Sequence, residues 1–187
     1  KPFFYILIKN KMKEDPVKVF NEAIKNGAII IICSKSCKFQ STKVNVIKTK
    51  KVRHLLSELA SKFYKSKPKN IIAVTGTNGK TSVSDMFYQI LRINNIRVAS
   101  IGTLGIKYND KIIKTSLTSP DTITLHKNLN YLKNKKINNV IIEASSHGLD
   151  QKRLHHIKFK GAIFTNFSQD HLDYHKTMKS YLNAKLI

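Results

Sequence analysis

Apolar residues near the start of the chain alternate between runs typical of strands and spacings typical of helices. The apolar segments 3–8 and 28–33 predict two buried strands, and 44–47 predicts a further short one. Between the first two, Asp15 followed by Pro16 predicts the start of a helix, with an N-cap and a proline at the first helical position. Apolar residues at helical spacing over 52–63 predict a second helix. The opening of the chain therefore predicts a small β-α-β domain.

A polar, proline-broken segment at 65–70 separates this opening from a longer alternation of strands and helices. The predicted strands are 71–75, 97–101, 140–144 and 162–167, with a hairpin of 104–108 and 112–115. The predicted helices are 80–93, 121–135, with core contacts from Ile123, Leu129 and Leu132, and one that begins at 178. This alternation predicts an α/β fold with a doubly wound, mostly parallel sheet over residues 68–187, preceded by the smaller α/β domain of residues 1–67.

Composition narrows the classes of protein to consider. The chain has 187 residues, 41% of them hydrophobic, and a formal net charge of +23. The lysines are scattered through every segment without an arginine-rich stripe, so we interpret the charge as solvated faces and expect no nucleic-acid partner. The longest apolar run, 28–33, is too short to cross a bilayer, and the first residues show no signal peptide. We therefore expect a cytoplasmic protein with no membrane span. Cys33 and Cys37 lack further zinc ligands nearby and are expected to be reduced thiols.

The segment 74–82, Val-Thr-Gly-Thr-Asn-Gly-Lys-Thr-Ser, is the strongest local signal. It follows a predicted buried strand and opens a predicted helix, which is the context of a phosphate-binding loop. Lys80 would neutralise the β- and γ-phosphates of ATP, and Thr81 would offer its hydroxyl to Mg²⁺. Val74 stands where the usual pattern has its first glycine. We predict that ATP is held by Thr75, Gly76, Thr77, Asn78, Gly79, Lys80, Thr81 and Ser82.

Two more strand ends carry polar groups. Glu143 follows the apolar segment 140–142, at the end of the strand where open parallel sheets bind ligands. Its carboxylate predicts a Mg²⁺ ligand, with an ion pair to a lysine as the alternative. The segment 164–175 contains His171 and His175, for which a zinc pair is an alternative that lacks a third ligand nearby. We favour one histidine as a Mg²⁺ ligand and the other as structural.

Three segments in this order resemble the Mur ligases of peptidoglycan synthesis: Thr-Gly-Thr-Asn-Gly-Lys-Thr at 75–81, Glu-Ala-Ser-Ser-His-Gly at 143–148 and Asp-His-Leu-Asp-Tyr-His at 170–175. The resemblance is closest to the branch that adds the third amino acid of the stem peptide. It rests on 117–121, 145–149, Gln151, Arg153 and the Tyr-Leu-Asn-Ala-Lys segment at 181–185. A valine before the loop is normal for this family. Residues 1–67 resemble part of its UDP-sugar-binding domain, and 68–187 resemble most of its central P-loop domain.

The resemblance also implies roles for individual residues. Lys80, His171 and Lys185 are implied to be catalytic, and the metal set is implied to be Thr81, Glu143, His171 and a carbamylated Lys185. The implied contacts to the nucleotide-sugar peptide are Thr118, Ser119, Ser145, Gln151 and Arg153. Ser119 stands where a second threonine is common, and it keeps the hydroxyl.

The activity implied is an ATP- and Mg²⁺-dependent amide-bond ligation. ATP would phosphorylate the D-glutamyl γ-carboxylate of UDP-N-acetylmuramoyl-L-alanyl-D-glutamate, and diaminopimelate or lysine would attack the acyl phosphate. The resemblance implies a monomer whose third domain is missing here, so the chain alone is expected to be inactive as a ligase. Two rival functions remain open. A folylpolyglutamate synthetase should lack the Ser-Ser-His-Gly segment, and a nucleic-acid-stimulated NTPase should respond to nucleic acid but not to the muramoyl dipeptide.

Overall fold

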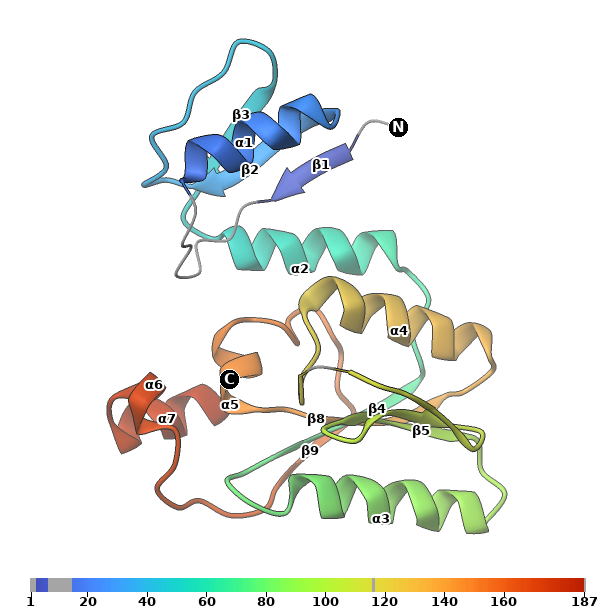
Figure 1. The fold of residues 1–187 in the computed structure, drawn as a ribbon. Coiled ribbons are helices and arrows are strands. Elements are labelled where there is room, and N and C mark those ends of the chain that lie inside the picture. Colours follow the sequence, from blue (N-terminus) through green and yellow to red (C-terminus); the bar gives the residue numbers. More distant parts are fainter. Residues whose placement is uncertain (1–2, 7–14, 116, 187) are drawn as a thin grey trace. The chain divides into compact units, whose positions relative to one another are not determined.

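The computed structural model describes residues 3–6, 15–115 and 117–186, which form two units, residues 1–56 and 57–187 (Figure 1). The first unit contains a parallel sheet with the strand order β1-β2-β3, made of β1 (Phe3–Ile6), β2 (Ala28–Ser34) and β3 (Asn45–Thr49). The part of the first predicted strand beyond residue 6 lies outside the described residues. The predicted β-α-β opening is confirmed.

Helix α1 (Pro16–Lys25) begins as its sequence indicates. The Asp15 carboxylate accepts a 3.0 Å hydrogen bond from the amide of Val17, which satisfies one of the amides that the first turn leaves unpaired. Phe20 is fully buried and packs in the core of this unit with Ile31 and Cys33. This small core explains why so short a unit keeps a defined sheet.

Helix α2 (Val52–Phe63) contains the boundary between the two units. Its C-terminal part belongs to the second unit, because the Ser57 hydroxyl donates 2.6 Å to the carbonyl of His155 and the Ser61 hydroxyl donates 3.4 Å to the carbonyl of His156. The structural boundary therefore precedes the polar segment 65–70 from which the sequence boundary was predicted.

The second unit is built on a six-stranded sheet with the order β7-β6-β5-β8-β4-β9. Strands β5, β8, β4 and β9 run parallel, and β6 and β7 form an antiparallel hairpin at one edge. Helices α3 and α4 lie on opposite faces of the sheet (Figure 1). The predicted doubly wound, mostly parallel sheet is therefore confirmed. The strands are β4 (Asn70–Thr75), β5 (Val98–Gly102), β6 (Gly105–Tyr108), β7 (Lys111–Ile113), β8 (Asn139–Glu143) and β9 (Gly161–Phe164). The helices are α3 (Lys80–Ile93), α4 (Thr122–Asn134), α5 (Ser146–Asp150), α6 (Leu172–His175) and α7 (Met178–Lys185).

The core of the second unit lies between the sheet and α4. Leu125, Leu129 and Leu132 of α4 are fully buried against the apolar residues of β5 and β8. Ile123, predicted as a core contact, is 48% exposed, so that prediction is wrong. The buried stripe begins at Leu125 instead, because positions 125, 129 and 132 share one helical face and 123 lies off it.

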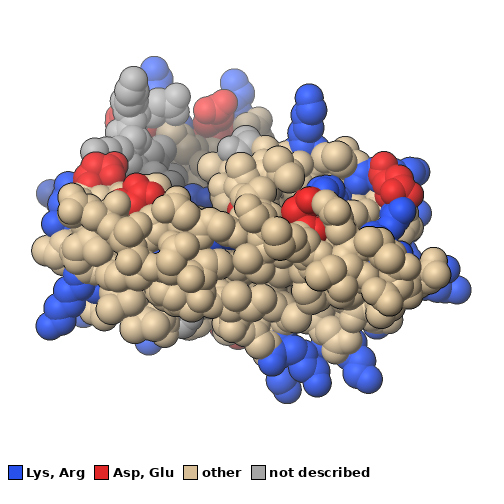
Figure 2. Space-filling view, turned by 90° about the horizontal axis from the view of Figure 1, so that it is seen from below, with Lys and Arg blue, Asp and Glu red and all other residues tan. Residues whose placement is uncertain are grey.

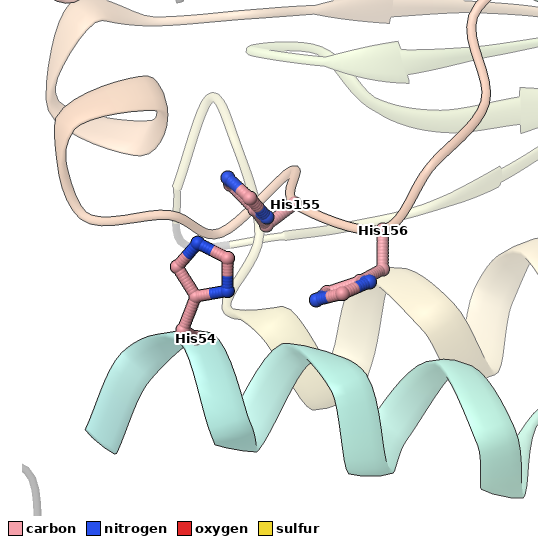
Figure 3. A group of neighbouring side chains, drawn as sticks. All are labelled: His54, His155 and His156. Carbon is pink, nitrogen blue, oxygen red and sulfur yellow. The ribbon is translucent and has the colours of Figure 1, made fainter. Parts of the chain in front are cut away.

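A buried histidine joins α4 to the loop that follows α5. The Nε2 atom of His126 lies 3.3 Å from the carbonyl oxygen of His155 and 3.5 Å from the Ser57 hydroxyl. Burial lowers the pKa of His126 from 6.5 to about 4, so the ring is neutral at pH 7. The rings of His155 and His156 are 5.3 Å apart, and Figure 3 draws them with His54 of α2. His54 belongs to the first unit, so the three rings do not define a site within either unit.

Charged side chains are sparse across the middle of the face that carries α3. Figure 2 shows uncharged residues across the middle of this face, with most Lys and Arg side chains projecting from its rim. Met86, Ile90 and Ile93 of α3 are all more than half exposed. Among the described residues, every helix is too short or too polar to span a membrane.

Candidate functional site

The predicted phosphate loop leaves the carboxyl end of β4 and turns into α3. Gly76 has φ +137° and Gly79, the N-cap of α3, has φ +81°, so both take backbone conformations that favour glycine. A Cβ at Gly76 would overlap the Thr165 hydroxyl, whereas a Cβ at Gly79 would have ordinary contact distances. Glycine is therefore required at position 76 for space as well as for conformation.

The segment that follows β9 braces the loop. The amide of Thr77 donates 3.0 Å to the carbonyl of Asn166, and the amide of Asn78 donates 2.9 Å to the Asn166 side chain. The Thr165 hydroxyl donates 2.6 Å to the carbonyl of Asn78. These two amides are engaged in the protein, whereas the first amides of α3 have no intrahelical acceptor and are available to an anion.

Lys80 is folded back over its own loop. Its Nζ donates 2.7 Å to the carbonyl of Thr77 and 3.0 Å to the carbonyl of Gly76. Burial, together with the nearby charge of Lys185, holds the pKa of Lys80 below its ordinary value. An anion bound at the loop would offset both effects.

The structure brings Thr81 and Glu143 together, as the sequence predicted for a metal pair. The Thr81 hydroxyl donates 2.9 Å to Oε2 of Glu143, a carboxylate that is only 2% exposed. Thr103 also binds this carboxylate, through its amide at 3.1 Å and its hydroxyl at 3.0 Å. A Cβ at Gly102 would overlap the Glu143 carboxylate, so this glycine makes room for it. The carboxylate is thus held in place by neutral donors.

Ser119 and Ser145 lie beside the end of β8. The Ser119 hydroxyl donates 2.8 Å to the carbonyl of Glu143 and accepts 2.9 Å from the amide of Ser145. Thr118 reaches the same region, with its hydroxyl 3.1 Å from that of Thr103. Ser119 is 1% exposed, so its hydroxyl connects the two loops inside the protein. Thr118 and Ser145 line the cavity.

Arg153 and Gln151 form a hydrogen-bonded network with Ser119. The Arg153 guanidinium donates to Oε1 of Gln151 at 3.1 and 2.7 Å and to the carbonyl of Ser119 at 2.8 Å. Gln151 in turn lies 3.4 Å from the Tyr174 hydroxyl, which donates 2.7 Å to Asp150. The fork of Arg153 is therefore fixed by protein partners next to the cavity, outside the residues that line it.

The two histidines of the 170–175 segment have different surroundings. His171 lines the cavity, with Nδ1 3.5 Å from the Asp170 carboxylate, and has φ +53° at the start of α6. His175 is buried, and its Nε2 has no hydrogen-bond partner among the described residues. Both rings lie near His147, at centroid distances of 4.8 and 5.5 Å. Burial and these neighbouring rings lower the pKa of His147. His171 is therefore half-buried at the cavity, whereas His175 is buried away from it.

Lys185 lies at the end of α7 and reaches the loop. Its Nζ donates 2.6 Å to the carbonyl of Gly76 and lies 4.4 Å from the centroid of the Tyr181 ring. The side chain is buried, which lowers the pKa of Lys185 to about 8. A substantial fraction of this amine is therefore neutral under mildly alkaline conditions.

These groups enclose a cavity of about 280 Å³. Its lining comprises Thr77, Asn78, Gly79, Lys80, Thr81, Ser82, Thr103, Thr118, Glu143, Ser145, Ser146, His171 and Lys185. Two ammonium groups, a buried carboxylate and several hydroxyls in one cavity fit a bound polyphosphate with a hard divalent cation. The oxygen atoms of Thr81 and Glu143 are the type of ligand that Mg²⁺ prefers. A second hollow of about 750 Å³ lies in the first unit, between α1 and residues 39–43, and has no comparable set of groups.

Several residues of the site were missed by the sequence reasoning. Thr103 follows the end of β5, so the rule that polar groups at the carboxyl ends of parallel strands share one edge would have found it. Thr165 and Asn166 lie in a segment that was singled out, yet their role depends on pairing between β9 and β4, which the local pattern does not contain. Tyr181 lies one helical turn before Lys185, which is the available signal for it.

Comparison with known proteins places these segments in one family. Residues 74–187 match the Mur ligase middle domain. A UDP-N-acetylmuramoyl-L-alanyl-D-glutamate--2,6-diaminopimelate ligase of Brucella melitensis is 38% identical over 184 residues, which are 98% of this chain and 38% of that protein. The ligase of the same name from Rickettsia montanensis is 44% identical over 169 residues, 88% of this chain and 35% of that protein. The chain thus spans little more than a third of the length of these relatives.

Solved structures agree with this placement. A UDP-N-acetylmuramoyl-L-alanyl-D-glutamate--2,6-diaminopimelate ligase superposes with a TM-score of 0.78 at 31% identity, over 99% of this chain and 37% of that one. A MurF ligase from Thermotoga maritima in complex with ADP superposes with a TM-score of 0.60 at 20% identity, over 98% of this chain and 39% of that one. The second likeness concerns the fold alone.

Proposed function

The chain belongs to the Mur ligase family, and from this premise we propose that it is the ATP-binding part of a ligase that adds the third amino acid to UDP-N-acetylmuramoyl-L-alanyl-D-glutamate. The observation that carries the proposal is the single cavity that Lys80, Thr81 and Glu143 share at the carboxyl edge of a parallel sheet. The names of the relatives support 2,6-diaminopimelate as the amino acid, with lysine as the alternative that an assay separates.

We assign the ATP phosphates to the loop 75–82. The two glycines would let its backbone approach the ligand, and the first amides of α3 would be available to a bound anion. Lys80 would exchange its bonds to the Gly76 and Thr77 carbonyls for the β- and γ-phosphates. Its ammonium would then offset the charge that spreads over the transferred phosphoryl group.

We assign Mg²⁺ to Thr81, Glu143, His171 and a carbamylated Lys185. The buried Glu143 carboxylate and the Thr81 hydroxyl supply hard oxygen ligands, and His171 lines the same cavity. A bound Mg²⁺ would reduce the repulsion between the carboxylate nucleophile and the γ-phosphate. Carbamylation would turn the Lys185 cation into a further carboxylate ligand at this edge.

The reaction proposed has two steps. A γ-carboxylate oxygen of the D-glutamyl residue attacks the γ-phosphorus of ATP, the bond to ADP breaks, and an acyl phosphate forms. The amine then attacks the carbonyl carbon, and the tetrahedral intermediate expels phosphate and loses a proton. The role of this chain would be to hold the carboxylate and the γ-phosphate within reach of one another. Positioning and charge stabilisation of this kind supply most of the rate gain in phosphoryl transfer.

Contacts to the peptide substrate are proposed for Thr118, Ser145, Gln151 and Arg153, and the buried Ser119 would support them through its bonds to Ser145 and Arg153. Thr118 and Ser145 line the cavity, and Arg153 is fixed beside it by Gln151 and Ser119. A guanidinium fork held in this way matches a carboxylate of the peptide. We further propose that residues 1–67 belong to the domain that binds the uridine nucleotide, and that the enzyme is a cytoplasmic monomer.

Two measurements test the proposal. The chain should bind ADP in a Mg²⁺-dependent manner by isothermal titration calorimetry. The full-length protein should make a tripeptide precursor from ATP, UDP-N-acetylmuramoyl-L-alanyl-D-glutamate and diaminopimelate, with lysine as the competing amine. The chain as given should form no tripeptide, because it spans little more than a third of the length of its relatives and ligation needs closure over ATP and a positioned amine. ATP hydrolysis that nucleic acid stimulates and the muramoyl dipeptide does not would contradict the proposal.

A further inference from the structure

Tyr181 of α7 is fully buried and touches the phosphate loop through its one polar atom. Its hydroxyl lies 3.2 Å from the Thr77 hydroxyl. Its ring stacks on Phe167 at a centroid distance of 5.3 Å, and the Lys185 ammonium lies 4.4 Å from the centroid of the same ring. One side chain therefore meets the loop, the segment after β9 and the end of α7.

The other hydrogen bonds of the Thr77 hydroxyl determine which of the two hydroxyls, Tyr181 or Thr77, donates in the bond between them. A hydroxyl has one proton and two lone pairs. The Thr77 hydroxyl donates its proton to the carbonyl of Ser168 at 3.1 Å and accepts from the Ser168 amide at 3.0 Å. One lone pair remains, so Tyr181 must donate to it. The bond has a fixed direction, and it completes the set of partners of Thr77.

Thr77 is also one of the two residues that bind the Lys80 ammonium. The Thr77 carbonyl accepts 2.7 Å from the Lys80 ammonium, and the Thr77 amide is bound by Asn166. The hydroxyl, amide and carbonyl of Thr77 are therefore all engaged. Removing the Tyr181 bond would loosen one of the two residues whose carbonyls hold the Lys80 ammonium.

Resting on the proposed function, we propose that Tyr181 is a positioning residue that presets the phosphate loop for the nucleotide, through its hydroxyl bond to Thr77. A loop that is already held in shape loses less conformational freedom when a ligand binds. The alternative is that Tyr181 only fills the core. The ring performs that packing, and the hydroxyl performs the positioning, so the two roles can be separated by Tyr181→Phe.

The experiment compares Tyr181→Phe with Tyr131→Phe in the chain. Tyr131 of α4 also bonds another hydroxyl, that of Tyr108 at 2.9 Å, so both changes remove one tyrosine hydroxyl bond. Three quantities are measured: the Kd for ADP with Mg²⁺, the amide hydrogen exchange of residues 76–79, and the Tm. We expect Tyr181→Phe alone to weaken ADP binding, by about two- to tenfold, and to speed exchange in the loop. The Tm checks that both variants remain folded at the temperature of the binding measurement.

A second pair of variants connects the effect to Thr77. Thr77→Val removes the hydroxyl and Thr77→Ser keeps it, so Thr77→Ser should retain more ADP affinity. In the Thr77→Val background, Tyr181→Phe should cause no further loss of affinity, because the two changes remove the same bond. Unchanged ADP affinity and loop exchange in Tyr181→Phe, or independent and multiplying losses in the double variant, would overturn the inference. If Tyr181→Phe does not fold, equal affinities of Thr77→Val and Thr77→Ser would overturn it.

Failure of the proposed function can be distinguished from failure of the proposed role of Tyr181. If the unaltered chain does not bind ADP, the proposed nucleotide site is wrong. The loop exchange rates then decide the role of Tyr181 alone, since faster exchange in Tyr181→Phe than in Tyr131→Phe supports a loop-positioning role and equal exchange refutes it.

Discussion

The ammonium of Lys185 donates a 2.6 Å hydrogen bond to the carbonyl oxygen of Gly76, joining the end of α7 to the phosphate loop. The same carbonyl accepts 3.0 Å from Lys80, so two lysines meet at one oxygen. Each charge disfavours the other, and Lys185 contributes to the lowered pKa of Lys80. The site therefore favours either an anionic ligand or the loss of one of these two charges.

Lys80→Ala should abolish ATP-dependent ligation in the full-length protein while leaving the fold intact. Within the part of the chain that the structure describes, the side chain bonds only loop carbonyls, so its loss removes phosphate neutralisation and little packing. Turnover and Tm are measured together, with Lys65→Ala in the exposed linker as the control. Retention of more than about a tenth of the unaltered turnover would show that this loop is not the ATP site.

Alanine at three glycines should give three different results. Gly76→Ala introduces both a collision with Thr165 and a strained φ of +137°, so it should lower stability and ADP binding most. Gly79→Ala adds strain without collision and should cost about 1–2 kcal/mol. Gly161→Ala meets open space and should have little effect. Chemical denaturation and ADP titration rank the three, and a Gly76→Ala as mild as Gly161→Ala would refute this loop geometry.

Arg153→Lys should weaken binding of the peptide substrate about tenfold and spare ATP, since a lysine cannot keep the planar fork. In the structure that fork is held by Gln151 and Ser119, so a lysine would also lose these bonds. The KM values for the two substrates are compared in the full-length protein, with Arg97→Lys at an exposed position as the control. Equal changes in both KM values, or no change, would count against the anchor role.

The sequence predicted those parts of the fold and site that local patterns determine. Buried strands, the cap at Asp15 and the loop glycines follow from residue type and spacing, and the structure has them. The hydrogen bond between Asn166 and Asn78 depends on which strands become neighbours in the sheet. A short stretch of sequence does not contain that information. The exposure of Ile123 shows that helical spacing alone does not identify the buried face of α4. The spacing is compatible with two overlapping apolar faces, and tertiary packing decides which of them is buried.

The second unit should become less stable as the pH is lowered, because of His126. The pKa of this ring is about 4 in the folded chain and 6.5 when exposed, so the unfolded state binds more protons between these values. The stabilisation is complete above pH 6.5 and is lost as the pH falls toward 4, by on the order of 3 kcal/mol. Urea denaturation at pH 7 and pH 5 should show a smaller difference for His126→Gln than for the unaltered chain. Equal pH dependence of His126→Gln and the unaltered chain would refute this account.

Lys185 offers the sharpest test of the proposed metal site. Its buried amine has a pKa of about 8, so the neutral form that reacts with CO₂ is accessible near physiological pH. An unmodified ammonium would repel Mg²⁺ at Glu143 and Thr81, whereas a carbamate would supply a hard oxygen ligand. The alternative is that Lys185 acts only as the hydrogen-bond donor to Gly76 seen here.

Lys185→Ala in the full-length protein separates the two roles, because added short-chain carboxylic acids can restore a carboxylate but not an ammonium. We expect the variant to lose most of its ligase activity and to recover part of it in acetate or propionate, with a matching recovery of Mg²⁺ affinity. Short-chain amines at the same concentration serve as the control, since they restore a hydrogen-bond donor to the Gly76 carbonyl. Recovery with amines and not with acids would assign Lys185 to the loop instead of the metal. Full activity without any additive would show that neither role is needed for ligation.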